Sequence, residues 1–329
     1  MQALYITLIA VFGTIILIVA TLFLVAFAVN KGVFGTRHDK NPLLKYYTAE
    51  DFGLTARQVD ISCVKNEYVR GVIYKKEGVA LKKELIIFCH GMGPGHIAYT
   101  TEISYLCNLG YTVLAPDYYG SGLSDGKNLK SNLSALNAIM ASIFYAEANL
   151  SFDKIYLVGH SWGAYSALCA ANQAGTVSAV VAISAPDKSE KIMRNSLSKR
   201  MPKFVANLLY PFLCIACGGE SAGKSAEQIM PKIPILLIHG EKDPLVPLEI
   251  SAFTAANGEH ITKYLAKDKR HNPYNTVAAE KKLAELLKGT HQYKNGEVDE
   301  EFFKNFDFAA ATEEDSEVMA EIARFLSKN

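Results

Sequence analysis

Charged residues are scarce in this 329-residue chain and absent from its beginning. Asp, Glu, Lys and Arg together make up 20% of the sequence, and no charged residue precedes Lys31. Basic and acidic residues nearly balance, which leaves a formal net charge of +1. This balance lacks the basic excess typical of proteins that bind nucleic acids, so we expect no nucleic-acid partner.

Cysteine is also sparse, and its pattern argues against a metal site. The six cysteines lie mostly inside apolar segments, as buried thiols do. Cys214 and Cys217 form a C-x-x-C without the second nearby pair that a zinc site needs. The sequence also lacks G-x-G-x-x-G, the signature of a dinucleotide-binding turn. We therefore expect neither a metal nor a cofactor.

The charge-free beginning contains one long apolar run, residues 3–29. About 20 such residues cross a bilayer as a helix, so we predict a transmembrane anchor over residues 1–30 and a juxtamembrane linker over residues 31–56. The alternative is a cleaved signal peptide, because Ala26-Phe27-Ala28 resembles a small-residue cleavage site. The length of the run and the lack of a preceding basic residue favour the anchor.

Basic residues follow the apolar run, whereas none precedes it. Those closest to the run are Lys31, Arg37, Lys40 and Lys45. By the positive-inside rule, this asymmetry places the rest of the chain in the cytoplasm. The sequence thus predicts a single-pass membrane protein with a cytoplasmic domain.

Beyond the linker, apolar segments alternate with helical ones. Residues 58–64 and 68–74 alternate apolar and polar side chains, which predicts a half-exposed antiparallel hairpin. Continuous apolar runs, which predict strands buried on both faces, follow at residues 84–89, 111–115, 154–158, 179–183, 235–238 and 261–265. Helical patterns separate the first four runs, so we expect an α/β fold with a mostly parallel sheet.

The alternation breaks at residues 188–232, where a basic part precedes an apolar part. We interpret this segment as a small cap insertion over the catalytic end of the sheet, within one domain that covers residues 57–329. The last residues, 299–329, have a helical pattern. Its apolar face consists of Val318, Ile322, Phe325 and Leu326.

Gly159-His160-Ser161-Trp162-Gly163 directly follows the apolar run 154–158 and directly precedes a helical segment. A G-x-S-x-G between strand and helix is typical of a nucleophile elbow, which lifts a serine hydroxyl clear of its surroundings. Ser161 is therefore the candidate nucleophile. The N–H of Trp162, at the start of the helix, is a candidate oxyanion donor. His160 is expected to be packed inside the elbow.

A serine nucleophile needs a base, an orienting acid and a second oxyanion donor. Asp243 follows the run 235–238, in a loop turned by Pro244, and is the candidate acid, with Glu241 as its competitor. His271 lies just past the last strand and is the candidate base. The glycine-rich loop after residue 89 offers the N–H of Met92 as the second donor.

Gly218–Ser225 matches the phosphate-binding pattern G-x-x-x-x-G-K-S letter for letter. A working phosphate loop needs a full helix after it, but Pro231 and Pro234 leave little more than one turn. We interpret the match as fortuitous, with nucleotide binding through Lys224 as the alternative function.

Over about residues 59–326, the chain resembles the α/β-hydrolase superfamily. The resemblance rests on the His90-Gly91 loop, Pro116-Asp117 with the following Gly120–Ser124, the elbow at Ser161, Asp243 in an HGxxDxxVP-like loop, and His271. Within the superfamily, the plan is similar to the serine aminopeptidase and monoacylglycerol lipase or lysophospholipase-like group. The resemblance implies the α/β-hydrolase fold, with an eight-stranded, mostly parallel sheet, and hydrolysis through an acyl-enzyme.

The sequence thus predicts a membrane-anchored serine hydrolase. Because residues 3–29 would hold the domain at a bilayer, we expect lipid-like carboxylic esters as substrates, such as acylglycerols or lysophospholipids. An aminopeptidase or acyltransferase with the same triad is the main alternative. A non-catalytic membrane scaffold would tolerate loss of Ser161.

Overall fold

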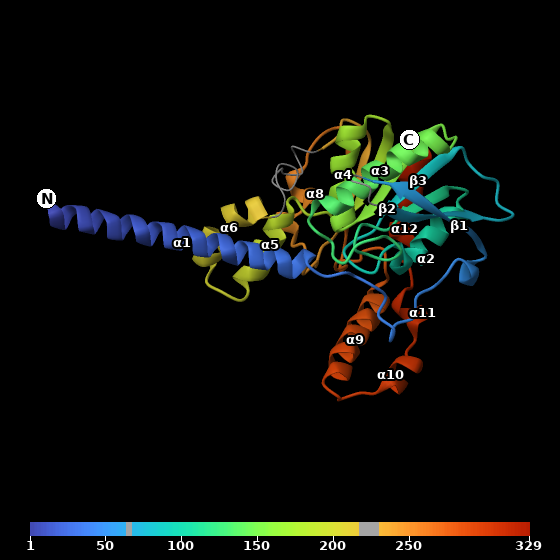
Figure 1. The fold of residues 1–329 in the computed structure, drawn as a ribbon. Helices are drawn as coiled ribbons and strands as arrows, with labels where there is room; N and C mark the ends of the chain where they lie inside the picture. The colour runs from blue at the N-terminus through green and yellow to red at the C-terminus, as the bar shows by residue number, and fades with distance from the viewer. Residues whose placement is uncertain (64–67, 217–229) are drawn as a thin grey trace.

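An eight-stranded sheet forms the centre of the molecule (Figure 1). The computed structural model describes residues 1–63, 68–216 and 230–329. The strands are β1 (Leu54–Ser62), β2 (Tyr68–Lys76), β3 (Glu84–Cys89), β4 (Thr112–Pro116), β5 (Lys154–His160), β6 (Val177–Ile183), β7 (Ile235–Gly240) and β8 (Ile261–Ala266). Their order is β1-β2-β4-β3-β5-β6-β7-β8; β2 runs antiparallel to both neighbours, and the other pairs are parallel. This confirms the predicted mostly parallel sheet.

Helices cover both faces of the sheet, and the sheet separates two hydrophobic cores. They include α2 (Thr100–Asn108), α3 (Leu133–Asn149), α4 (Trp162–Ala174) and α12 (Ser316–Lys328). On β3, Leu85 and Ile87 join the core under α3 and α4, whereas Ile86 and Phe88 join the core under α2 and α12. Neighbouring residues of a strand point to opposite faces, so the run is apolar throughout because both faces are buried.

The edges of the sheet differ from the central strands. The β1–β2 pairing confirms the predicted antiparallel hairpin, but β1 begins at Leu54, inside the predicted linker. The predicted turn, residues 65–67, lies outside the described residues. The predicted strand at 261–265 is present as β8, but the prediction that it is buried was wrong. Among the described residues β8 pairs with β7 alone, at the edge of the sheet, and Thr262, Lys263 and Leu265 are exposed.

The predicted helical tail is divided into three helices because aspartates cap them separately. After the long α9 (Val277–Lys294) come α10 (Glu300–Lys304), α11 (Phe308–Ala311) and α12. The side chains of Asp299, Asp307 and Asp315 accept backbone N–H bonds at the three helix starts. The predicted apolar face of α12 is buried in the core, whereas α9, α10 and α11 project away from the sheet (Figure 1).

The N-terminal apolar run forms one helix, α1, from Gln2 to Phe34. Within the described residues, it is the one helix long and apolar enough to cross a membrane, a property that signal sequences share. Its N-terminal part projects from the molecule (Figure 1), and its side chains are exposed there. Ala26, Asn30 and Phe34, spaced four apart on one face, are buried. The helix therefore extends past the predicted boundary at residue 30 and ends packed on the domain.

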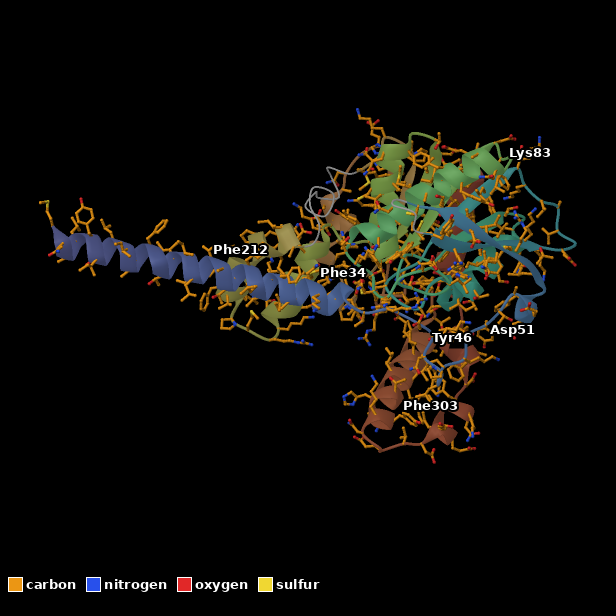
Figure 2. All side chains as sticks on the ribbon, in the orientation of Figure 1. Phe34, Tyr46, Asp51, Lys83, Phe212 and Phe303 are labelled. Atoms are coloured by element: carbon orange, nitrogen blue, oxygen red, sulfur yellow. The ribbon has the colours of Figure 1, made fainter. Side chains whose placement is uncertain are left out.

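Two helices between β6 and β7 lie beside the packed end of α1 (Figure 1). They are α5 (Ser189–Ser198) and α6 (Lys203–Ala216), within the predicted cap segment. Phe212 of α6 and Phe34 of α1 both lie near this junction (Figure 2). The phosphate-loop-like stretch, residues 218–225, lies outside the described residues, so its predicted lack of function stays a prediction.

The segment after α1 is fastened to the domain by its backbone and by one arginine. The guanidinium of Arg37 donates to the carbonyl oxygens of Gly122, Ser124 and Gly126. His38 donates its N–H to the carbonyl of Gly120 at 2.9 Å. The beginning of the predicted linker is thus held against the loop that follows β4.

Candidate active site

Ser161 occupies a strained turn between β5 and α4. Its φ is +55°, a left-handed conformation that residues other than glycine seldom adopt. A Cβ on Gly163 would overlap the carbonyl of Cys89, and one on Gly159 would lie 2.8 Å from the Cα of Ala164. Only glycine fits at both flanks, which explains why the elbow has this sequence.

The three candidate catalytic side chains form one chain of hydrogen bonds. Ser161 Oγ lies 2.9 Å from His271 Nε2, and His271 Nδ1 lies 2.7 Å from Asp243 Oδ2. Because the ionised carboxylate can only accept, Nδ1 carries the proton and Nε2 is left to accept from the serine hydroxyl. These residues come from three loops at the carboxyl ends of β5, β7 and β8.

Asp243 is held in place by its own loop. Its other oxygen, Oδ1, accepts the N–H groups of Leu245 and Val246 at 2.8 and 2.9 Å. Burial disfavours the charge, but the hydrogen bond from His271, its attraction and these N–H groups together lower the pKa of Asp243. Glu241, the competitor, accepts the N–H of Asp268 on the exposed side of the loop. The structure therefore brings Asp243, and not Glu241, to His271.

The loop that carries His271 is fixed by a carboxylate and a lysine that the sequence did not single out. Both oxygens of Glu280 accept the N–H of Arg270, at 3.1 and 3.0 Å. Lys269 Nζ donates to the carbonyl of Asn275 at 2.7 Å and to Asp315 Oδ2 at 2.5 Å. These bonds join the residues just before His271 to the starts of α9 and α12.

His160 is packed inside the elbow, as expected, and bonds to both sides of the site. Its Nε2 lies 2.9 Å from the carbonyl oxygen of His271, and its Nδ1 lies 2.9 Å from the Tyr99 hydroxyl. That hydroxyl accepts the N–H of Gly91 at 3.0 Å. Burial, with repulsion from His271, lowers the pKa of His160 to about 3, so the ring is neutral and donates from Nε2. The ring links the His90-Gly91 loop to the base.

The two residues that carry the predicted oxyanion donors, Trp162 and Met92, line the same cavity as Ser161. α4 begins at Trp162, whose N–H is among the first four of the helix and has no partner within it. The Met92 side chain lines the cavity that contains Ser161. Asp117 holds the loops near Met92 by accepting the N–H groups of His96 and Leu123. The roles of Trp162 and Met92 stay predictions.

A largely apolar cavity of about 540 Å³ opens above Ser161 and His271. Its walls come from α1, from α5 and from the loops that carry Met92 and Val246. Arg200, just after α5, is the other ionisable residue in the described lining besides His271. A larger cavity, about 810 Å³, lies between residues 41–47 and α10–α11, away from the triad.

Two carboxyl groups lie behind the site: Glu102 on α2 is buried, and Glu314 just before α12 is half-buried. Burial raises the pKa of Glu102 to about 7. Burial, with repulsion from Glu102, raises the pKa of Glu314 to about 8. In the unfolded chain both groups would release their protons near pH 4.5. Between that pH and the raised pKa of each group, the native state therefore binds more protons than the unfolded state.

Glu314→Gln should therefore stabilise the protein at pH 8 and have little effect at pH 5. The contribution of Glu314 is present below about pH 4.5 and is lost as the pH rises towards 8, a loss that the neutral amide avoids. We expect a rise in Tm of about 3 °C or more at pH 8, measured by thermal unfolding in detergent. Glu317→Gln, exposed on α12, is the matched control. An equal shift at both pH values would contradict the assignment.

The chain matches one family model and resembles several solved structures. The family model described as alpha/beta hydrolase fold matches residues 84–218. An esterase of Pyrococcus furiosus, Pf2001, has a TM-score of 0.56 at 21% identity, covering 77% of this chain and 98% of its own. Est1E of Butyrivibrio proteoclasticus, solved with ferulic acid, has a TM-score of 0.51 at 21% identity, covering 73% and 98%.

Sequence relatives match over shorter segments. A probable aminopeptidase, YbaC, of Bacillus subtilis is 35% identical over 97 residues, which cover 28% of this chain and 30% of the relative. Epoxide hydrolase 3 of Siraitia grosvenorii is 31% identical over 80 residues, which cover 24% and 25%. The matched segments thus span less than a third of these relatives. The family match over residues 84–218, the strand order and the structural likeness together show that the chain has the α/β-hydrolase fold.

Proposed function

We propose that the protein is a serine hydrolase that cleaves carboxylic esters. The observation that carries the proposal is the chain of hydrogen bonds from Ser161 through His271 to Asp243 at the wall of an apolar cavity. His271 takes the hydroxyl proton as Ser161 attacks the ester carbonyl, and returns it to the leaving alcohol. Water then cleaves the acyl-enzyme with the same base.

The negative charge that develops on the carbonyl oxygen needs donors beside Ser161. We assign this role to the backbone N–H groups of Trp162 and Met92. The N-terminus of α4 adds a favourable dipole at the same place. The reaction as proposed uses no metal or cofactor.

We further propose that the substrates are lipid-like and that α1 is a retained membrane anchor over residues 3–29. The cavity lining is mostly apolar, and the exposed side chains of α1 are apolar over its projecting part. Ala26 is fully buried on the domain, so α1 contributes packing there. A removed signal sequence would expose that surface, which favours retention.

Peptide hydrolysis remains the second candidate, because one relative carries the name of an aminopeptidase. An aminopeptidase must hold a free ammonium group, for which a carboxylate is the usual partner. The described lining of the cavity contains Arg200 and no Asp or Glu. This distribution of charge favours an uncharged or anionic ester.

A substrate panel tests the proposal. We expect hydrolysis of p-nitrophenyl esters and of monoacylglycerols or lysophospholipids in mixed micelles, at least 100-fold faster than hydrolysis of aminoacyl anilides and of epoxides. Preferred cleavage of anilides would instead support an aminopeptidase. A folded protein that cleaves no ester and is not labelled by a fluorophosphonate would overturn the proposal.

We place the catalytic domain on the cytoplasmic side, as the basic residues after α1 favour. The sequence contains two glycosylation sequons, Asn132-Leu133-Ser134 and Asn149-Leu150-Ser151. Asn132 is buried and Asn149 is exposed, so only Asn149 is informative. We expect Asn149 to carry no glycan after translation into microsomes, and the domain to be digested by added protease. A sequon added before Met1 is the positive control. A glycan on Asn149 would reverse the orientation.

A further inference from the structure

The last turns of α1 form part of the wall of the active-site cavity. Val29, Gly32, Val33 and Phe34 line the same cavity as Ser161 and His271. Residues 29, 32 and 33 lie on one face of the helix, because three- and four-residue spacings bring side chains together. An adjoining face, with Ala26 and Asn30, is buried on the domain.

The packing of α1 fixes this wall in place. The ring of Phe34 lies 5.8 Å from the ring of Trp162, the residue directly after Ser161. The indole Nε1 of Trp162 in turn donates to the carbonyl of Asn132 at 3.1 Å. The end of α1 is thus linked through two aromatic rings to the elbow, and Arg37 fastens the chain just after it.

Gly32 leaves this wall open. A Cβ built on Gly32 would meet no atom within 4 Å, so the position faces free space. The opposite wall is formed by α5, through Ile192, Met193 and Leu197. Both walls are apolar, and the cavity beside Gly32 is not filled by a side chain of α1.

The apolar wall continues into surfaces that face away from the sheet. Towards its N-terminus, α1 is exposed and apolar. Beside α1, α6 exposes Phe204, Leu208 and Ile215. Exposed apolar surfaces of this extent are typical of contact with a membrane. An acyl chain could therefore pass from lipid to Ser161 along α1 without crossing water.

We propose that α1, besides anchoring the protein, forms one wall of the site for the acyl chain of the substrate, and that Gly32 sets the chain length. This inference rests on the proposed esterase function of Ser161. Each methylene that the site buries strengthens binding about fourfold. Hydrolysis should therefore speed up as the acyl chain lengthens, until the space beside Gly32 is filled.

Gly32→Phe tests this directly, because the new ring would enter the free space beside α5. For wild type in detergent micelles, we expect kcat/KM to rise from acetate to decanoate esters of p-nitrophenol. In Gly32→Phe, the advantage of the decanoate should fall at least tenfold, with acetate hydrolysis changed less than threefold. Gly32→Ala should have an intermediate profile.

Gly13→Phe is the matched control, since a Cβ there also meets no atom within 4 Å, but the residue is exposed on α1 and lies outside the cavity lining. Its chain-length profile should equal that of wild type. An unchanged profile in Gly32→Phe, with acetate hydrolysis intact, would overturn the acyl site and leave the esterase standing. If wild type cleaves neither ester, the proposed function fails, and the inference fails with it.

Discussion

Replacing Ser161 by alanine should lower kcat for ester hydrolysis by about 10⁴- to 10⁶-fold. The substitution removes the oxygen that lies 2.9 Å from His271 Nε2 and leaves the cavity otherwise intact. The residual rate would come from the oxyanion donors and from substrate binding alone. Labelling by a fluorophosphonate, which needs an activated serine, should disappear completely.

Ser198→Ala is the control for this result. The Ser198 hydroxyl, at the end of α5, donates to the carbonyl of Asn195 and lies outside the cavity lining. Its loss should leave both labelling and hydrolysis within twofold of wild type. Full labelling of a folded Ser161→Ala protein would mean that another serine is the nucleophile.

Asp243→Asn should lower kcat by about 10⁴-fold near neutral pH while preserving the fold. The wild-type carboxylate accepts the proton on His271 Nδ1. An amide can instead donate to Nδ1, which moves the ring proton to Nε2 and prevents that nitrogen from accepting the serine proton. Steady-state kinetics with a soluble ester would measure the loss in kcat.

The competitor Glu241 supplies the matched control. Its carboxylate accepts the N–H of Asp268 and is exposed, so Glu241→Gln should change kcat by less than threefold. A large loss in Glu241→Gln together with a small loss in Asp243→Asn would exchange the two roles. Equal losses in both would indicate a general effect on the loop after β7.

The elbow at Ser161 and the loops that carry Asp243 and His271 could be predicted, because each is recognised from residues that are neighbours in the sequence. Ser161 is flanked by Gly159 and Gly163. Asp243 and His271 each follow, within a few residues, the apolar strand that positions them. In a parallel sheet, the carboxyl ends of the strands meet at one edge, so the order along the chain was sufficient to select these residues.

The supporting contacts could not be predicted because they join distant segments. Tyr99 and His160 are 61 residues apart, and no pattern in either segment indicates their hydrogen bond. The exposure of β8 depends on its place at the edge of the sheet, which its apolar residues do not reveal. The packing of α1 on the domain likewise depends on α6 and, at Phe34, on Trp162, both far along the chain.

The packing of α1 on the domain affects how substrate reaches Ser161. The exposed part before Leu22, residues 2–21, measures about 30 Å as a helix, which equals the hydrocarbon thickness of a bilayer, about 30 Å. With this part in lipid, Ser161 would stand at a fixed depth near the headgroup layer. Its rate would then follow the mole fraction of substrate in that one leaflet, by two-dimensional diffusion, and not the concentration of substrate in the surrounding water.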